Sequence, residues 1–232
     1  MKNDEMYLVY QPICNDEQYI IGYEVLMRWD SHSLGSVKPL AMLASFEENT
    51  LTNELNDWFF DRLIKDVEEV GLLRVKKLFI NLSFKQLEDG SLDPNINKLE
   101  SVLELSKIVF EVTESTVTSD INKVLDTMTS LTKKGVLFAL DDFGIGFSSL
   151  KHLKLLPLHY IKIDREFVGE IDISHADMTI VKAALDMSKA LGLEVIAQGV
   201  ENQSQFVLLR SMGMSYFQGY LFNKPCLKSE LT

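Results

Sequence analysis

The sequence predicts an α/β fold, a (β/α) barrel formed by a single domain. Short apolar runs typical of strands recur along the 232 residues, with amphipathic helical stretches between them. The first two runs are separated only by a polar turn at residues 15–18, which indicates a hairpin and hence an antiparallel start. No linker divides the chain. An open doubly wound sheet is the alternative, but no Gly-x-Gly-x-x-Gly follows a strand, so its dinucleotide-binding form has no support.

The individual elements follow from apolar periodicity. Strands are predicted at Leu8–Ile13, Ile20–Arg28, Leu78–Asn81, Ile108–Glu111, Leu137–Asp141, Tyr160–Ile163, Glu194–Ala197 and Tyr216–Gly219. Helices are predicted at Leu40–Glu48, Thr52–Val70, a stretch from Pro94 to Leu105, Asn122–Lys134, Ser148–Leu153, Asp177–Leu191 and Asn202–Met212. The second helix shows the clearest apolar face, formed by Leu55, Phe59, Leu63, Val67 and Val70.

Composition narrows the range of functions. A hydrophobic content of 46% and a net charge of −11 are typical of a globular protein and argue against binding a nucleic-acid polymer, which needs a basic face. No apolar run approaches the ~20 residues of a membrane helix. Cys14 and Cys226 lie at opposite ends of the sequence without a disulfide framework, and the polar start resembles no signal peptide. These features predict a cytoplasmic protein.

Polar side chains stand where the predicted strands end, which is the end of such barrels that carries the active site. They are Glu24, Arg28, Asn81, Glu111, Asp141, Asp142, Lys162, Asp164, Gln198 and Gln218. Any single polar residue there is explained by the chain reaching water. Because they recur at equivalent ends of separate strands, we expect them to converge on one site.

The residue types favour chemistry with a hard divalent cation. Glu24, Asn81, Glu111 and Asp141 offer only oxygen ligands, which suit Mg²⁺ or Mn²⁺, and Asp142 is placed to bridge a second ion. Two ions ~3.5–4 Å apart suit attack on a phosphodiester.

Lys162 would add a fixed positive charge beside such a site. The four histidines are scattered and form no His-Glu-x-x-His motif, so zinc hydrolysis is not indicated.

Seven motifs resemble those of the EAL family of bacterial cyclic di-GMP phosphodiesterases, in the family's order from about residue 7 to residue 225. They are Tyr10–Ile13, Gly22–Trp29, Ile80–Ser83, Phe110–Ser115, Asp141–Leu150, Ile161–Arg165 and Gln218–Phe222. The resemblance implies one EAL domain over residues 1–232, built as a TIM-like (β/α)8 barrel with its first strand antiparallel. It also implies hydrolysis of the second messenger cyclic di-GMP to linear pGpG.

The resemblance also implies roles for individual residues. Glu24, Asn81, Glu111 and Asp141 would hold one or two Mg²⁺ or Mn²⁺ ions together with Asp142, and Lys162 would contact the attacking water. Substrate would be bound by Gln11, Leu26, Arg28, Asp164 and Gln218. Glu114 would anchor the loop at Asp141–Leu150, which in the family links metal occupancy to a homodimer interface.

Two positions depart from the family pattern. Val25 replaces the alanine of Glu-Ala-Leu, an apolar exchange that we expect to be tolerated. Gln198 replaces a glutamate that the family uses as metal ligand or general base. A carboxamide cannot accept a proton, and loss of a general base lowers turnover by roughly 10²–10⁴-fold.

Gln198 leaves three interpretations open: a receptor or protein-binding module that does not turn over, an enzyme inactivated by design, or slow turnover on one metal. The rest of the polar constellation matches the family, including the loop and Lys162, which favours an enzyme over a degenerate module. A protein-interaction module that needs no ligand is the alternative from another functional class.

Overall fold

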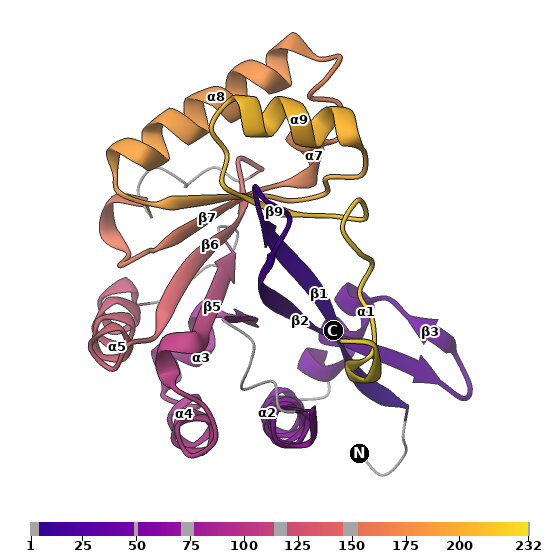
Figure 1. The fold of residues 1–232 in the computed structure, drawn as a ribbon. Helices are drawn as coiled ribbons and strands as arrows, with labels where there is room; N and C mark the ends of the chain where they lie inside the picture. The colour runs from indigo at the N-terminus through magenta and orange to yellow at the C-terminus, as the bar shows by residue number, and fades with distance from the viewer. Residues whose placement is uncertain (1–4, 49–50, 71–76, 114–119, 146–152, 232) are drawn as a thin grey trace.

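The computed structural model describes residues 5–48, 51–70, 77–113, 120–145 and 153–231. Eight strands form a closed barrel, and Figure 1 shows helices around its outside. The strands are β1 (Met6–Asn15), β2 (Ile20–Ser31), β4 (Leu78–Leu82), β5 (Ile108–Thr113), β6 (Leu137–Phe143), β7 (Tyr160–Ile163), β8 (Glu194–Ala197) and β9 (Tyr216–Gln218).

The first strand closes the barrel in the antiparallel sense. Strand β1 pairs antiparallel with both β2 and β9, while the pairs from β2–β4 round to β8–β9 are parallel. The predicted (β/α) barrel with an antiparallel first strand is therefore confirmed.

Strand β2 is longer than the sequence predicted. It continues to Ser31 and pairs there with a short strand, β3 (Gly35–Val37), which extends from the body in Figure 1. Three residues carry no measurable periodicity, so β3 was not predicted. Glu24 lies in the middle of β2, and not at its end.

Most helices lie close to their predicted positions. The helices are α1 (Pro39–Glu48), α2 (Thr52–Val70), α3 (Phe84–Asp89), α4 (Asp93–Glu100), α5 (Ile121–Lys133), α7 (Arg165–Val168), α8 (His175–Ala190) and α9 (Gln203–Ser211), with 3₁₀ turns η2 (Leu105–Lys107) and η3 (Lys228–Glu230). The short helices α3 and α7 were not predicted.

Two helix predictions need comment. The stretch from Pro94 to Leu105 is wrong at its end, because α4 stops at Glu100 and the Ser101 hydroxyl donates to the Lys98 carbonyl, ending the helix. The helix predicted at Ser148–Leu153 falls almost wholly outside the described residues.

On α2, Leu55, Phe59, Leu63 and Val67 are buried, as its periodicity predicted. In the described residues, no helix is long and apolar enough to cross a membrane.

The inside of the barrel is divided into an apolar and a polar layer. Buried residues Ile13, Ile21, Phe79, Val109, Ala139, Tyr160 and Ile196 form a separate apolar cluster. Five of these apolar residues are followed, two positions later in the sequence, by a polar residue on the strand or directly after it. The polar residues are Asn81, Glu111, Asp141, Lys162 and Gln198. Since strand side chains alternate between faces, both sets point into the barrel. The apolar layer closes one end, and the polar layer forms the other.

Candidate active site

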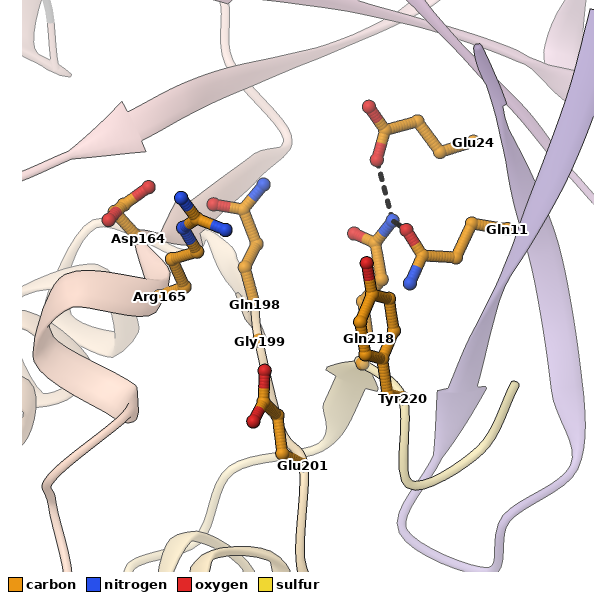
Figure 2. Close-up of a pocket in the computed structure, with 10 residues that line it drawn as sticks. Gln11, Glu24, Asp164, Arg165, Gln198, Gly199, Glu201, Gln218 and Tyr220 are labelled. Carbon is orange, nitrogen blue, oxygen red and sulfur yellow. Dashed lines mark hydrogen bonds between the residues drawn. The ribbon is translucent and has the colours of Figure 1, made fainter. Parts of the chain in front are cut away.

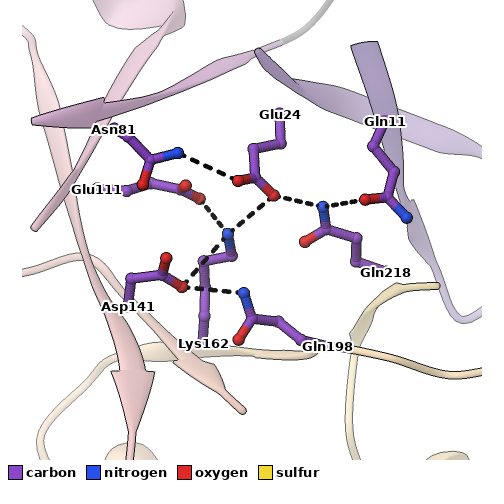
Figure 3. Close-up of polar contacts among 8 residues, drawn as sticks. All are labelled: Gln11, Glu24, Asn81, Glu111, Asp141, Lys162, Gln198 and Gln218. Carbon is purple, nitrogen blue, oxygen red and sulfur yellow. Dashed lines mark hydrogen bonds and ion pairs between the residues drawn. The ribbon is translucent and has the colours of Figure 1, made fainter. Parts of the chain in front are cut away.

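Eight polar side chains converge at the polar end of the barrel, each from a different strand or the residue directly after it. Figure 3 shows them pointing toward one another: Gln11, Glu24, Asn81, Glu111, Asp141, Lys162, Gln198 and Gln218. They span more than 200 residues of sequence, so only barrel closure brings them together.

Lys162 lies at the centre of this group. Its side chain is fully buried, and Nζ lies 2.6 Å from Glu111 Oε1, 3.2 Å from Glu24 Oε2 and 3.4 Å from Asp141 Oδ1. Three carboxylates therefore face one ammonium group. Full ionisation of all three would leave a buried net charge of −2, which low-dielectric surroundings disfavour.

The pKa values reflect this imbalance. Burial raises the pKa of Glu111 well above its ordinary value, repulsion from Glu24 and Asp141 adds to the effect, and Lys162 opposes it only in part. Burial likewise raises the pKa of Asp141. For Glu24 burial acts in the same sense, but the Lys162 charge and hydrogen bonds from Gln218, Lys162 and Asn81 outweigh it and lower its pKa.

Lys162 itself stays charged. Burial alone would lower its pKa, but the three carboxylates raise it well above the ordinary value. Its ammonium group is thus a fixed cation and no proton donor near neutral pH.

Carboxamides complete the polar layer. Gln218 donates to Glu24 Oε2 and, at 3.3 Å, to Gln11 Oε1, while Asn81 Nδ2 donates to Glu24 Oε1 at 3.2 Å. Glu24 is therefore held through both carboxylate oxygens, by Gln218 at Oε2 and by Asn81 at Oε1.

Gln198 binds one of the carboxylates directly. Its Nε2 donates to Asp141 Oδ1 at 2.9 Å. A glutamate at this position has no proton to donate at neutral pH, and it would place a further negative charge against Asp141. The hydrogen bond therefore depends on the amide.

Asp142 leaves the β ladder beside this group. It has a positive φ of 54°, unusual for a residue other than glycine, and the β6–β7 register shifts between Leu140 and Phe143. The bulge directs Asp142 toward Asp164. Burial, with the neighbouring charges of Asp141 and Asp164, raises the pKa of Asp142 to about 6.

Asp164 has a second, structural role. Its Oδ1 accepts from the backbone N–H of Glu166 at 2.7 Å, which makes it the N-cap of α7. The sequence predicted only a ligand contact for this residue.

Two hollows border Glu24. One, of about 190 Å³, is lined by polar groups and is called here the polar hollow; Figure 2 shows its residues, Gln11, Glu24, Asp164, Arg165, Gln198, Gly199, Glu201, Gln218, Gly219 and Tyr220. The other, of about 430 Å³, has mainly apolar walls from β2, β4, α1 and α2, and is called the apolar hollow. Leu26 and Arg28 line the apolar hollow.

The comparisons with known proteins decide the family. The EAL domain family model matches residues 1–225. The chain belongs to the EAL domain family.

Relatives within this family carry named activities. The chain is 32% identical to the cyclic di-GMP phosphodiesterase NbdA of Pseudomonas aeruginosa over 97% of this chain and 29% of that protein. It resembles the solved MucR phosphodiesterase in its cyclic di-GMP complex, from the same organism, with a TM-score of 0.88 and 32% identity over 98% of this chain and 94% of that one.

A second solved structure is a complex with calcium. The BlrP1 calcium and cyclic di-GMP complex of Klebsiella pneumoniae has a TM-score of 0.82 and 28% identity, covering 97% of this chain and 57% of that one. The chain spans about a third of the length of the curated relatives, 27% to 37% of each.

The donor set of the EAL chain fits a hard cation. Within the described residues, no three Asp, Glu, His or Cys side chains are arranged as ligands of one ion, because the carboxylates point at Lys162. Several buried oxygens nevertheless accept no hydrogen bond, namely both of Glu111 and the carboxamide oxygens of Gln198 and Gln218. Glu111 Oε1 has only its ion pair with Lys162. Unsatisfied buried oxygens are suited to an ion such as Mg²⁺.

Among the EAL residues predicted from sequence, the structure brings eight into one network and places Asp142 and Asp164 beside it. Leu26 and Arg28 lie apart, in the apolar hollow, and Glu114 falls outside the described residues. Sequence reasoning assigned no contact to Arg165 or Tyr220, which also line the polar hollow. Both belong to matched motifs, Ile161–Arg165 and Gln218–Phe222, and that membership was the available signal.

Proposed function

We propose that this chain binds cyclic di-GMP at the polar end of the barrel and hydrolyses one of its phosphodiester bonds to give linear pGpG. The observation that carries the proposal is the buried Lys162 facing Glu24, Glu111 and Asp141 in an all-oxygen site between two hollows. Lys162 would orient and polarise the attacking water. Family membership and the cyclic di-GMP complex of the MucR structure support the ligand.

The shape of the site supports a ligand with two bases. Because the polar and apolar hollows both border Glu24, one base would enter each, with the scissile phosphate between them. Leu26 would pack against guanine in the apolar hollow and Arg28 would contact a phosphate there. Gln11, Gln218 and Asp164 would contact ligand in or beside the polar hollow.

One or two Mg²⁺ or Mn²⁺ ions would be held by Glu24, Asn81, Glu111 and Asp141, with Asp142 at a second position. Bound there, the ions would supply charge stabilisation for the attacking and leaving oxygens. The chain's own contribution is to hold these oxygens in place, through Gln218 on Glu24 and through Lys162 on all three carboxylates.

Gln198 reduces turnover in this proposal. It cannot take the proton of the attacking water, and its Nε2 occupies Asp141 Oδ1, a proposed metal ligand. We propose that residues 1–232 act as one EAL domain in a homodimeric, cytoplasmic bacterial protein, with Glu114 anchoring the loop at the dimer interface.

The same hydrogen bond favours a second candidate function. The amide of Gln198 already bonds Asp141, a proposed metal ligand. Such a site would still contact cyclic di-GMP but would not hydrolyse it, as in a cyclic di-GMP receptor. Receptor and enzyme share the binding site and differ in the fate of the nucleotide.

The Gln198→Glu variant separates the two functions. Wild type and variant are incubated with cyclic di-GMP and Mg²⁺ or Mn²⁺, and pGpG is measured by chromatography. We expect the variant to form pGpG about 10²–10⁴-fold faster, because it regains a general base. Gln203→Glu on the exposed start of α9 is the matched control and leaves the rate unchanged.

Two other outcomes would exclude one or both candidate functions. If Gln198→Glu binds metal and nucleotide but releases no pGpG, the enzyme is excluded and the receptor remains. Absence of cyclic di-GMP binding to both proteins in calorimetry excludes both candidates and leaves a ligand-independent interaction module.

A further inference from the structure

Arg165 is a cation at the mouth of the site. It begins α7, directly after the capping residue Asp164, and its exposed side chain borders the polar hollow and an adjoining hollow of about 560 Å³. Within the described residues, its guanidinium makes no hydrogen bond or ion pair. Figure 2 shows it between the carboxylate of Asp164 and the carboxamide of Gln198.

The stem of Arg165 packs in a cradle formed by Gly199. This glycine has a φ of +71°, and a Cβ added to it would lie 2.4 Å from Arg165 Cβ and 3.1 Å from Arg165 Cα. Any side chain at position 199 would therefore displace Arg165. The end of β8 and the start of α7 approach closely only because residue 199 has none. Packing against Gly199 thus positions the stem of Arg165 at the border of the polar hollow.

The charges around the polar hollow indicate what Arg165 would bind. The chain carries a net charge of −11, and the hollow itself is bordered by the carboxylates of Glu24, Asp164 and Glu201. Lys162 is buried against three carboxylates, and Arg28 lies in the apolar hollow. An anion that enters the polar hollow therefore meets Arg165 as the accessible cation among its lining residues.

The ligand of the proposed function is a dianion with two phosphodiester groups. A guanidinium matches phosphate oxygens with two parallel N–H donors, and such charge-assisted bonds are stronger than neutral ones. We infer that Arg165 binds the ligand phosphate on the polar side, opposite Arg28, and so selects for ligands that carry two phosphates. This inference rests on the proposed cyclic di-GMP site and adds a specificity-determining residue to it.

The test is calorimetric titration of cyclic di-GMP into wild type and the Arg165→Gln variant, with Ca²⁺ in place of a catalytic metal to avoid turnover. Loss of one charge-assisted contact is expected to raise Kd by about 10- to 100-fold. Raising the salt concentration should weaken wild type more than the variant, because screening acts on the lost ion pair. Arg165→Lys should recover part of the affinity.

Arg210→Gln is the matched control, because it removes the same charge from the exposed face of α9. Its Kd should stay within about two-fold of wild type, since exposed charges at a distance are screened. Thermal midpoints of all variants check that the fold is intact. A wild type that binds cyclic di-GMP and an Arg165→Gln variant with the same Kd would overturn this inference alone. A wild type that binds none overturns the proposed function as well.

The cradle gives an independent check. Gly199→Ala should weaken binding when Arg165 is present and add little in the Arg165→Gln background, because displacement of Arg165 is its means of action. Equal weakening in both backgrounds would show that Gly199 acts without Arg165 and would contradict the packing argument.

Discussion

At the scale of residues, the site is governed by how four buried charges are balanced. Lys162 alone compensates Glu24, Glu111 and Asp141, while Gln218, Asn81 and Gln198 supply neutral donors. A glutamine at position 198 adds no further negative charge to this group. The same feature that lowers the proposed turnover therefore relieves electrostatic repulsion when no metal is bound.

Replacement of Lys162 tests this balance. Lys162→Met keeps an unbranched side chain one heavy atom shorter but leaves three buried carboxylates without a counter-charge. We expect a loss of about 3–5 kcal/mol in the free energy of unfolding at pH 7.5, measured by urea denaturation. The loss should shrink toward pH 5, because protonation neutralises the carboxylates.

The matched control is Lys182→Met on α8, where the exposed Lys182 Nζ lies 3.7 Å from Asp186 Oδ2. Its effect should stay within about 0.5 kcal/mol. Equal effects of the two substitutions would mean that the site does not depend on the Lys162 charge.

At the scale of elements, short caps and turns position the site residues that follow strands. The loop from Gln198 leads into α9, whose N-cap Asn202 accepts from Gln205 N at 3.0 Å in a capping box. Gln205 is buried and its Nε2 donates to the Gly169 carbonyl at 2.7 Å, which links α9 to the end of α7. The segments that carry Arg165 and Gln198 are therefore joined by this link between the start of α9 and the end of α7.

Removal of the α9 cap should destabilise this pair. Asn202→Ala leaves the Gln205 N–H without its acceptor, and we expect a cost of about 1 kcal/mol in the free energy of unfolding. Gln203→Ala, at the next and exposed position, is the control and should be near neutral. An Asn202→Ala protein as stable as the control would show that the cap is dispensable.

At the scale of the whole molecule, formation of the site depends on closure of the barrel. The polar layer takes side chains from β1 through β9, and its members meet only when the barrel is closed. The C-terminal segment reinforces closure: Cys226 pairs with Tyr10 of β1, and Lys228 Nζ lies 2.7 Å from the buried Asp66 on α2. Asp66 also accepts from the Tyr10 hydroxyl at 2.9 Å.

Metal binding should therefore stabilise the whole fold, and more so at higher pH. Raised pKa values of Glu111, Asp141 and Asp142 mean that the folded chain holds protons that the unfolded chain releases above about pH 4. Their contribution to stability is lost as pH rises, for Asp142 through about pH 6. The lowered pKa of Glu24 changes the stability in the opposite sense, but only this one group opposes the three carboxyls whose pKa values are raised.

The measurement is the thermal midpoint at pH 5.5 and pH 8, with and without Mn²⁺. We expect the metal-free midpoint to fall over this interval and the increment from Mn²⁺ to grow, because the ion replaces the lost protons. An increment that is the same at both pH values would contradict metal binding by these carboxylates.

Sequence by itself determined the barrel, its antiparallel start and the residues of the polar layer. Alternation of strand side chains and the position of active sites at one barrel end are local and general rules, and Asn81, Glu111, Asp141 and Lys162 obey them. Motif order then gave the family. Apolar periodicity placed α2 and its buried face for the same reason.

Tertiary structure alone decided which of these groups touch. No local pattern encodes that Gln198 donates to Asp141, that a bulge turns Asp142 toward Asp164, or that Gly199 makes room for Arg165. These contacts join strands that are far apart in sequence, and their geometry depends on closure and on close packing. Sequence therefore identified the chemistry of the site, and the fold decided which charge each group compensates.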